Sequence, residues 1–386
     1  MANSADEQFL RQALELAARG HGLASPNPLV GAVIVDENGL VVGSGTHIYS
    51  ERKHAEVLAI EQAGPLARGN TLYLNLEPCS HSGRTGPCAE AVIAAGIARV
   101  VCCMEDPNPL VAGRGFKRLR AAGIRVETGI LEAEARRLNE SFAQYIRTGL
   151  PFVTLKAAMS LDGKIAGSPI PTYITGATSR RRVHEMRHAS DAIMVGVGTV
   201  IADDPLLTDR SGLPRRRPLL RVILDSRLRL PLSSRVVETA QHDVVVFCSF
   251  AEENKRRALE ARGVRVEQVE IEKRCPCIEQ LPHEGRPDLY RVLKMLGADQ
   301  ITSLLVEGGA AVNWACLRAQ LVDKLMIFYA PQIFGPVNTV PWLSGQNGLP
   351  PNIELRPSNI LVQRFGEDFA VEGYLRDPYQ PLRPRG

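Results

Sequence analysis

A short segment of turn-forming residues, Arg147–Pro151, divides this chain into two runs of alternating strand and helix patterns. Such alternation predicts a sheet layered with helices, and 386 residues leave room for two such units at the usual ~150 residues per domain. We therefore expect two α/β domains, at residues 1–147 and 151–386. The tail at 377–386 contains three prolines, and we expect it to be loosely ordered.

Turn and capping residues mark the elements of the first run. Ser4–Glu7 has the capping-box pattern of a helix start, and Asn38-Gly39 between two apolar runs predicts a β-hairpin. Gly96 has the position of a residue that ends a helix. The remaining pattern predicts strands at 71–76, 99–104 and 125–128, and helices from near 54 to just before 64, from about 88, at 115–122 and, unbroken, at 131–146.

The second run has the same character over a longer stretch. Residues 267–287 are polar with scattered Pro and Gly, which favours a loop or insertion. Strands are predicted at 152–158, 192–197, 219–224, 243–248, 303–307 and 324–330, with helical patterns between them.

Composition excludes several classes of protein. The chain is 45% hydrophobic and 23% charged, as globular chains are and disordered chains are not. No run approaches the roughly 20 apolar residues of a membrane-spanning helix, so we expect no membrane association. The N-terminus lacks a secretory pattern, and we expect a cytoplasmic protein. A net charge of +4 without a basic, aromatic-rich stripe argues against a nucleic-acid partner.

The first chemical motif combines one histidine, two cysteines and one glutamate. The H-x-E sequence at His54 and Glu56 opens a predicted helix, Cys79 follows a predicted strand, and Cys88 stands at the next helix start. One His and two Cys can hold zinc and leave a fourth position open for water, as a hydrolytic site requires. Glu56 is placed to carry a proton between that water and a leaving amine. The helix start also favours a thiolate at Cys88.

Two alternatives remain open for this motif. The zinc could be structural and closed by a fourth protein ligand, for which His81 is the candidate, or the thiols could hold no metal. The glutamate favours the catalytic interpretation, because a structural site has no use for it. Cys275 and Cys277 have only His283 nearby as a further ligand, and we expect solvent-facing thiols there rather than a metal site.

The residues around the first motif resemble a known family. HAEVLAI, NLEPCSHSGRTGPCAEAVIAAGIARVV and MEDPNPLVAGRGFKRLRAAGI are similar to the deaminase half of the bifunctional riboflavin-biosynthesis deaminase/reductases, whose pattern includes the long gap between the two cysteines. The resemblance implies a cytidine-deaminase-like three-layer fold, zinc bound by His54, Cys79 and Cys88, and Glu56 as proton shuttle. It implies substrate contacts from Asn27, His47, His81 and Arg84. Taken alone, Asn27 could instead be a turn residue and His47 a strand end that faces water.

The second run carries different motifs. It has no G-x-G-x-x-G between a strand and a helix, so a Rossmann domain is not predicted. Glu307-Gly308-Gly309 ends a predicted strand before a helix, where backbone N–H groups can meet a phosphate or the glycines simply make a tight turn. The acids Asp203 and Asp204, before a proline, could be catalytic or could cap a turn.

These motifs, with LKAAMSLDGKIA and VILDSRLRLP, are similar to the reductase half of the same family, which has a dihydrofolate-reductase-like fold and uses NADPH. The resemblance implies NADPH contacts from Ala158, Tyr173, Thr199, Asp203, Ser226 and the loop from Gly309. It implies substrate contacts from Arg187, Leu207, Arg210 and Glu307. The two arginines would meet the substrate phosphate. Lys156 and Asp203 are the candidates for supporting the sugar chemistry.

The two halves of the resemblance together predict the function. We expect zinc-dependent deamination of 2,5-diamino-6-(5-phosphoribosylamino)pyrimidin-4(3H)-one, then NADPH-dependent reduction of the ribosyl side chain to ribityl. Pro171 stands where the family commonly has serine, so a deaminase with an inactive or repurposed reductase domain is the alternative. A nucleic-acid deaminase and a non-catalytic, zinc-stabilised interaction protein are further rivals. We expect an enzyme that acts on a small-molecule substrate, and we expect the enzyme to form a homo-oligomer.

Overall fold

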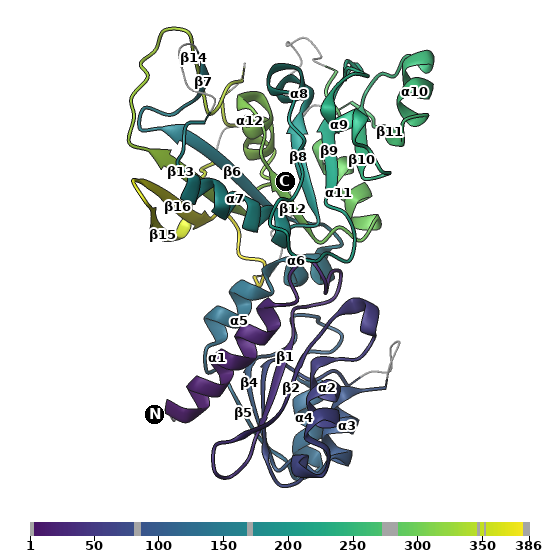
Figure 1. Ribbon diagram of the computed structural model, residues 1–386, viewed down its shortest axis with the longest axis vertical. Helices are drawn as coiled ribbons and strands as arrows, with labels where there is room; N and C mark the ends of the chain where they lie inside the picture. The colour runs from purple at the N-terminus through teal and green to yellow at the C-terminus, as the bar shows by residue number, and fades with distance from the viewer. Residues whose placement is uncertain are drawn as a thin grey trace. The chain divides into compact units, whose positions relative to one another are not determined.

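The structure is a computed structural model that describes residues 4–80, 86–167, 173–271, 285–345, 348–350 and 353–380. The chain forms two compact units, which are drawn in Figure 1. The first covers the chain up to Gly149 together with Pro214–Arg217, and the second covers Leu150–Leu213 and Pro218–Gln380. No helix within the described ranges is long and apolar enough to cross a bilayer.

The first unit is a single sheet between two layers of helices. Its elements are α1 (Ser4–Ala18), β1 (Gly31–Val35), β2 (Val41–Thr46), η1 (Tyr49–Glu51), α2 (Ala55–Ala63), η2 (Gly64–Ala67), β3 (Thr71–Leu76), α3 (Cys88–Ala94), β4 (Arg99–Met104), α4 (Arg114–Ala121), β5 (Arg125–Thr128), α5 (Glu132–Leu138) and α6 (Glu140–Thr148). The strand order is β2-β1-β3-β4-β5, antiparallel up to β3 and parallel from β3 to β5. In Figure 1, α1 and α5 cover one face of the sheet, and α2, α3 and α4 cover the other.

Small residues set the close spacing between α2 and the sheet. A Cβ atom on Gly45 would lie 2.2 Å from the carbonyl oxygen of Ala55, and one on Gly43 would lie 2.2 Å from that of Ala59. The alanines of α2 recur every fourth residue and so share one face, which packs directly on the backbone of β2. This contact fixes the first turn of α2, where His54 is the N-cap residue.

Most predicted elements of the first unit are confirmed. The Asn38-Gly39 turn joins antiparallel β1 and β2, and Gly39 has the positive φ of 81° that such a turn requires. The unbroken helix predicted at 131–146 is wrong. Asn139 separates α5 from α6, and its φ of −105° and ψ of 18° are not helical. The reason is tertiary, because the Asn139 amide bonds the backbone of Leu29, 110 residues earlier.

The second unit is built on a nine-stranded sheet. Its elements are β6 (Phe152–Ser160), β7 (Lys164–Gly167), α7 (Ala177–Ala189), β8 (Ala192–Gly196), α8 (Val197–Asp203), β9 (Leu220–Leu224), α9 (Arg235–Glu238), β10 (Val244–Cys248), α10 (Glu253–Glu260), β11 (Val264–Gln268), α11 (Leu289–Ala298), β12 (Ser303–Val306), α12 (Ala310–Arg318), β13 (Lys324–Ala330), β14 (Thr339–Pro341), β15 (Ser358–Phe365) and β16 (Asp368–Tyr374). The order is β11-β10-β9-β8-β12-β6-β13-β16-β15, and β7 pairs with β14 separately. The strands are parallel from β11 to β13, and β16 and β15 are antiparallel.

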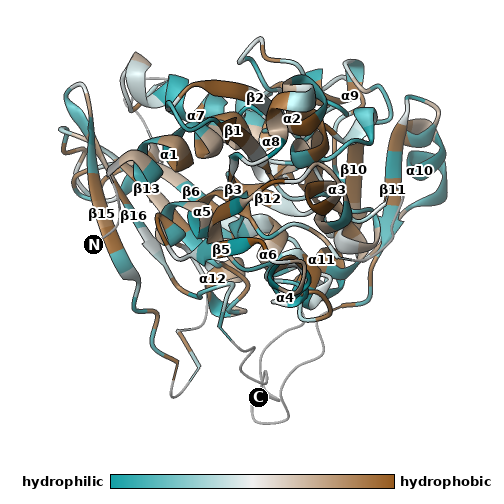
Figure 2. Ribbon diagram, turned by 90° about the horizontal axis from the view of Figure 1, so that it is seen from below, coloured by the Kyte–Doolittle hydropathy of each residue, from teal (hydrophilic) through white to brown (hydrophobic). Residues whose placement is uncertain are grey.

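Helices cover both faces of this sheet. Side chains of α11 and α12 join the core on one face, and those of α7, α8, α9 and α10 join the cores on the other. Figure 2 shows the resulting contrast between β10, which is hydrophobic along its length, and the mostly hydrophilic α10. The strands predicted from the sequence are confirmed, and those from β11 to β13 pair in parallel. Four of the predicted reductase residues lie at or just after strand ends: Ala158, Ser226, Glu307 and Gly309.

Several elements of the second unit were not predicted. The hairpin of β15 and β16 was missed because β15 is an edge strand whose side chains are mostly exposed, so it has no apolar alternation. Strand β11 extends into the segment predicted as a loop, and Ile271 forms a bridge with Pro287. Of the tail expected to be loosely ordered, residues 377–380 form a turn, and the rest lies outside the described residues.

Candidate active sites

Three elements of the first unit bring His54, Cys79 and Cys88 together. His54 caps α2, Cys79 follows β3, and Cys88 is the first residue of α3. His54 Nδ1 lies 3.1 Å from Cys88 Sγ and 3.6 Å from Cys79 Sγ, and all three donor atoms lie within 4.8 Å of one another. One imidazole nitrogen and two sulfurs at these separations fit a tetrahedral zinc ion with one position left for water. Among the residues that the structure describes, no fourth His, Cys, Asp or Glu joins this group.

Hydrogen bonds decide which of the two thiols is the better anion. The backbone N–H of Cys88 donates to Cys79 Sγ over 3.3 Å, and the Cys88 thiol donates to the same sulfur. Chiefly because of this thiol, and with help from His54, the pKa of Cys79 falls to about 4. The same bond, together with burial, raises the pKa of Cys88. Of this hydrogen-bonded pair Cys79 is the better anion, whereas zinc binding requires both sulfurs as thiolates, so the thiolate expected at Cys88 stays a prediction.

Glu56 lies beside this group on the first turn of α2. The residue is only 3% exposed, and its Oε2 atom has no hydrogen-bond partner among the residues that the structure describes. Burial raises the pKa of Glu56 to about 7, although the nearby His54 opposes the rise. A carboxyl group that exchanges its proton near neutral pH and keeps one oxygen free has the properties of a proton shuttle.

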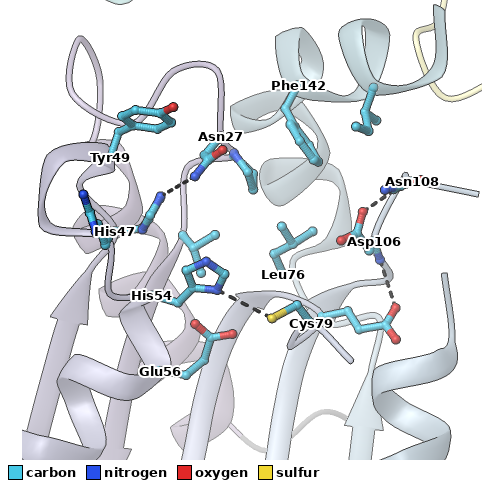
Figure 3. Close-up of a pocket in the computed structure, with 15 residues that line it drawn as sticks. Asn27, His47, Tyr49, His54, Glu56, Leu76, Cys79, Asp106, Asn108 and Phe142 are labelled. Carbon is cyan, nitrogen blue, oxygen red and sulfur yellow. Dashed lines mark hydrogen bonds between the residues drawn. The ribbon is translucent and has the colours of Figure 1, made fainter. Parts of the chain in front are cut away.

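His54, Glu56 and Cys79 line a cavity of about 270 Å³, one wall of which is polar (Figure 3). Asn27 Nδ2 lies 3.0 Å from His47 Nε2, and His47 Nδ1 lies 2.9 Å from the carbonyl oxygen of Lys53. Because a carbonyl oxygen only accepts, Nδ1 carries the proton and Nε2 accepts from the Asn27 amide. Burial lowers the pKa of His47, which is 3% exposed, so the alternative of a water-facing strand end is wrong. Asn27 Oδ1 is left to accept a hydrogen bond from a ligand.

A second wall of the cavity depends on the buried carboxylate of Glu77. Its Oε2 accepts the N–H groups of Asp106 at 3.1 Å and Gly113 at 2.9 Å. Its Oε1 accepts those of Gly115 at 2.7 Å and Phe116 at 3.2 Å. One side chain thereby satisfies four backbone donors and holds the loop between β4 and α4 in a single conformation.

Two residues of this loop, Asp106 and Asn108, line the cavity and were not predicted. Asp106 Oδ1 accepts the N–H of Asn108 at 2.8 Å, and Figure 3 shows both on the side of the cavity away from His47. The MEDPNP stretch does contain turn-forming Asp and Asn residues. Nothing in that stretch locates them at the cavity, because their position depends on Glu77, 29 residues before Asp106.

In the second unit, the predicted Lys156, Arg187 and Glu307 meet in one ion-paired group. Lys156 is on β6, Glu307 follows the parallel neighbour β12, and Arg187 is on α7. Arg187 donates to Glu307 through Nε at 2.6 Å and Nη2 at 3.1 Å, and Lys156 Nζ lies 3.4 Å from Glu307 Oε2. Burial acts to raise the pKa of Glu307, but the two cations outweigh it and lower the pKa to about 2. The group therefore holds a permanent carboxylate between two cations.

The other predicted catalytic residue, Asp203, is outside this group. It is the exposed last residue of α8. Its neighbour Asp204 accepts the N–H of Arg235 at 2.8 Å and so caps the start of α9. The capping role that the sequence left open for this pair therefore belongs to Asp204. On the segment that follows, Leu207 is buried and Arg210 is exposed.

Two of the predicted NADPH contacts are neighbours. Gly309 is the N-cap of α12, and a Cβ atom on it would lie 3.5 Å from Thr199 Oγ1. A Cβ atom on Gly308 would lie 2.7 Å from the Val312 side chain, so only glycine lets this strand-to-helix turn pack so closely. The backbone N–H groups of a helix start beside a hydroxyl fit an anionic phosphate of a dinucleotide.

The remaining predicted residues of the second unit are spread over its surface and strand ends. Ala158 is half-buried on β6, and Ser226 follows β9. Tyr173 is 64% exposed, and the guanidinium carbon of Arg180 lies 4.5 Å from the centre of its ring. His81, Arg84, Pro171, Cys275, Cys277 and His283 lie outside the described residues.

Comparisons with known proteins match both units. A family model of the cytidine and deoxycytidylate deaminase zinc-binding region matches residues 3–104, and a RibD C-terminal domain model matches residues 151–370. The riboflavin biosynthesis protein RibD of Aquifex aeolicus is 40% identical over 96% of this chain and 99% of its own. That of Escherichia coli K12 is 41% identical over 86% of this chain and 89% of its own.

Solved structures give the same match. Acinetobacter baumannii RibD is 36% identical with a TM-score of 0.80, covering 96% of this chain and 98% of that one. The diaminohydroxyphosphoribosylaminopyrimidine deaminase/5-amino-6-(5-phosphoribosylamino)uracil reductase of Thermotoga maritima is 34% identical with a TM-score of 0.79 and the same coverages, 96% and 98%.

Proposed function

This chain belongs to the RibD family of bifunctional enzymes of riboflavin biosynthesis, and from that premise we propose which of its residues carry each reaction. It is a zinc-dependent deaminase and an NADPH-dependent reductase. Both family models match, so the alternative of a deaminase with a repurposed second domain has no support. We assign deamination to residues 1–147 and reduction to residues 151–386.

The first reaction replaces the 2-amino group of 2,5-diamino-6-(5-phosphoribosylamino)pyrimidin-4(3H)-one with oxygen from water and releases ammonia. His54, Cys79 and Cys88 hold zinc, which when bound supplies a water acidic enough to react near neutral pH. Glu56 accepts a proton from that water and delivers one to the departing nitrogen. Its buried Oε2 supports this role, since no side chain or backbone group of the described residues binds that oxygen.

Other side chains hold the substrate for this step. Asn27 Oδ1 accepts an N–H of the pyrimidine, and the neutral His47 keeps the Asn27 amide turned that way. His81 and Arg84 remain proposals from the sequence, in which Arg84 meets the phosphate through paired N–H donors.

The second reaction opens the ribosyl ring to an imine and reduces its C1′ carbon, and NADPH supplies the hydride. Lys156 supplies the proton that the ring oxygen needs, because its ammonium group can give up a proton and the guanidinium of Arg187, the other cation of this buried group, cannot. Arg187 and Arg210 meet the phosphate, Glu307 and Leu207 hold the sugar, and Asp203 assists the proton transfer from α8. Thr199, Gly309, Ala158, Tyr173, Ser226 and Asp203 contact NADPH.

The grouping of His54 Nδ1 and the two cysteine sulfurs within 4.8 Å, beside a buried free oxygen of Glu56, is the observation that carries this proposal. The test gives the purified protein the diaminopyrimidinone substrate with NADPH and follows ammonia release and NADPH oxidation together. We expect equal amounts of both. If folded, zinc-loaded protein releases no ammonia and oxidises no NADPH, the assignment is overturned.

The role of Glu56 has its own test. Glu56→Gln keeps the size of the side chain and removes its proton exchange, so we expect ammonia release to fall at least about 100-fold. Bound zinc, measured by metal analysis, should stay at the wild-type level, because Glu56 is not a ligand. Unchanged deamination would remove Glu56 from the mechanism and revive the interpretation of a structural zinc.

A homo-oligomer and a cytoplasmic location remain proposals. Strand β15 supports the first, because it ends the sheet and exposes Ile360 at 54% and Val362 at 61%. The free thiols among the described cysteines support the second, since such thiols persist in reducing compartments. Light scattering of the wild type and Val362→Glu tests the oligomer, and fractionation of cells tests the location.

A further inference from the structure

Two buried asparagines hold the backbone that precedes β1. Asn139 Oδ1 accepts the N–H of Leu29 at 2.8 Å, and Asn139 Nδ2 donates to the Leu29 carbonyl at 3.0 Å. Asn75 Nδ2 donates to the same carbonyl at 2.8 Å, and Asn75 Oδ1 accepts the N–H of Gly31 at 2.9 Å. Asn139 is 1% exposed and Asn75 is fully buried. Every hydrogen-bonding position of the Leu29 peptide groups is therefore used by these two side chains.

This held segment lies directly beside the polar wall of the deaminase cavity. Asn27 stands two residues before Leu29, and Pro28 between them has its φ restricted by the proline ring. Pro28 and Val30 both line the cavity. Any shift of Leu29 is therefore transmitted to Asn27 through a stiff connection, with little freedom to absorb it.

Asn139 also adjoins the helix that lines the other side of the cavity. It stands immediately before α6, and Phe142 and Ile146 of that helix line the cavity. Phe142 and Ile146 are four residues apart and so share one face of α6, which Asn139 precedes as the N-cap residue. Figure 3 shows Phe142 and Asn27 both at the end of the cavity away from Glu56. The two hydrogen bonds from Asn139 thus join an apolar wall to a polar one.

We propose that Asn139 is a positioning residue of the deaminase site, which holds Asn27 in register with Phe142 and Ile146 so that the pyrimidine enters in one orientation. This inference rests on the proposed deaminase function. It accounts for the break between α5 and α6, because a continuous helix would carry the amide away from Leu29. Asn139 does not line the cavity, so its effect on the substrate passes through Asn27 and α6.

The first experiment compares the steady-state deamination kinetics of the wild type and Asn139→Ala. We expect KM for the diaminopyrimidinone to rise about tenfold, the order of effect of a small displacement of a binding group. Zinc content and NADPH oxidation with the deaminated intermediate should stay unchanged, since neither involves this segment. Asn70→Ala is the matched control, because it removes one exposed side-chain hydrogen bond in the same unit, from Asn70 Nδ2 to the Leu66 carbonyl. The KM of this variant should stay at the wild-type value.

A double-mutant cycle separates positioning from general stability. If Asn139 acts through Asn27, the Asn139→Ala change should raise KM by less than about twofold once Asn27 is already alanine. The proposal would be overturned if the two substitutions raised KM independently, so that their fold-changes multiply, or if Asn139→Ala alone left KM unchanged. In either case deamination by the wild type would leave the proposed function standing. A wild type without ammonia release would instead overturn the proposed function.

The alanine variant could fail to fold, and a second substitution covers that outcome. Asn139→Asp keeps the acceptor for the Leu29 N–H and replaces the donor to its carbonyl with a carboxylate oxygen that repels it. We expect the same rise in KM and the same loss of the effect in the Asn27→Ala background. Wild-type kinetics in folded Asn139→Asp would show that the paired bonds do not position the site.

Discussion

Glu307 is a buried anion between Lys156 and Arg187, and replacing it by glutamine should destabilise the second unit by about 3 kcal/mol at neutral pH. The Glu307→Gln variant keeps the shape of the side chain. It leaves two cations, at 14% and 15% exposure, without the carboxylate that neutralises them. Breaking a buried pair from one side is costly because the remaining charge has lost its water and gained no partner.

The magnitude follows from the pKa of Glu307. Its two cations, acting against burial, lower that pKa from the ordinary 4.5 to about 2. At about 1.4 kcal/mol per pH unit, the lowering corresponds to about 3 kcal/mol of stabilisation by the charged form. Because the folded-state pKa is the lower one, this stabilisation is complete above pH 4.5 and is lost as the pH falls toward 2. The difference in the free energy of unfolding between wild type and Glu307→Gln must therefore become smaller as the pH falls below 4.5.

Urea unfolding followed by tryptophan fluorescence measures this effect. The chain has two tryptophans, Trp314 and Trp342, and both belong to the second unit, so the signal reports on that unit alone. Glu267→Gln is the control, because its carboxylate pairs with Arg265 at 3.6 Å on the surface, and it should change the stability by less than about 0.5 kcal/mol.

Two results would refute the reasoning about Glu307. A destabilisation below about 1 kcal/mol at neutral pH would mean that relaxation or water neutralises Lys156 and Arg187 without it. A difference between wild type and variant that stays constant from about pH 6 to about pH 3 would mean that the charge of Glu307 does not carry the effect.

Further predictions concern the first unit. Glu77→Gln should raise KM for the diaminopyrimidinone about tenfold, because a glutamine side chain has one acceptor oxygen for four N–H donors and an NH₂ group that repels them. Glu90→Gln, which removes only an exposed pair with Arg118, is its control, and equal effects in both variants would contradict the role of Glu77. A zinc chelator should abolish ammonia release and spare NADPH oxidation with the deaminated intermediate; parallel loss of both activities would contradict two separate sites.

Local patterns were enough to predict most of the strands. β3, β4 and β13 have the bounds expected from their apolar runs, because buried strands are continuous in sequence. The helix predicted at 131–146 was broken by a bond from Asn139 to Leu29, which no window of neighbouring residues contains. Strand β15 was missed for the opposite reason, since an exposed edge leaves no apolar period to detect.

The candidate sites divide in the same way. The types and spacing of His54, Glu56, Cys79 and Cys88 predicted a zinc group, and the structure brings the three ligand atoms within 4.8 Å. The lower pKa of Cys79 depends chiefly on its contact with the Cys88 thiol, which only the fold brings beside it, and could not be predicted. The cavity residues Asp106 and Asn108 could not be predicted either, since the loop that carries them is held by Glu77, 29 residues before Asp106.

The sequence by itself therefore determined the order of the elements, the division into two α/β runs and the chemistry of the zinc group, because each depends on residue types at short, regular spacings. Only the tertiary structure decided how Arg187 meets Glu307 across 120 residues and how Asn139 meets Leu29 across 110. Such pairs form because a buried polar group must find a partner within about 3 Å, and folding, rather than proximity in the chain, supplies that partner.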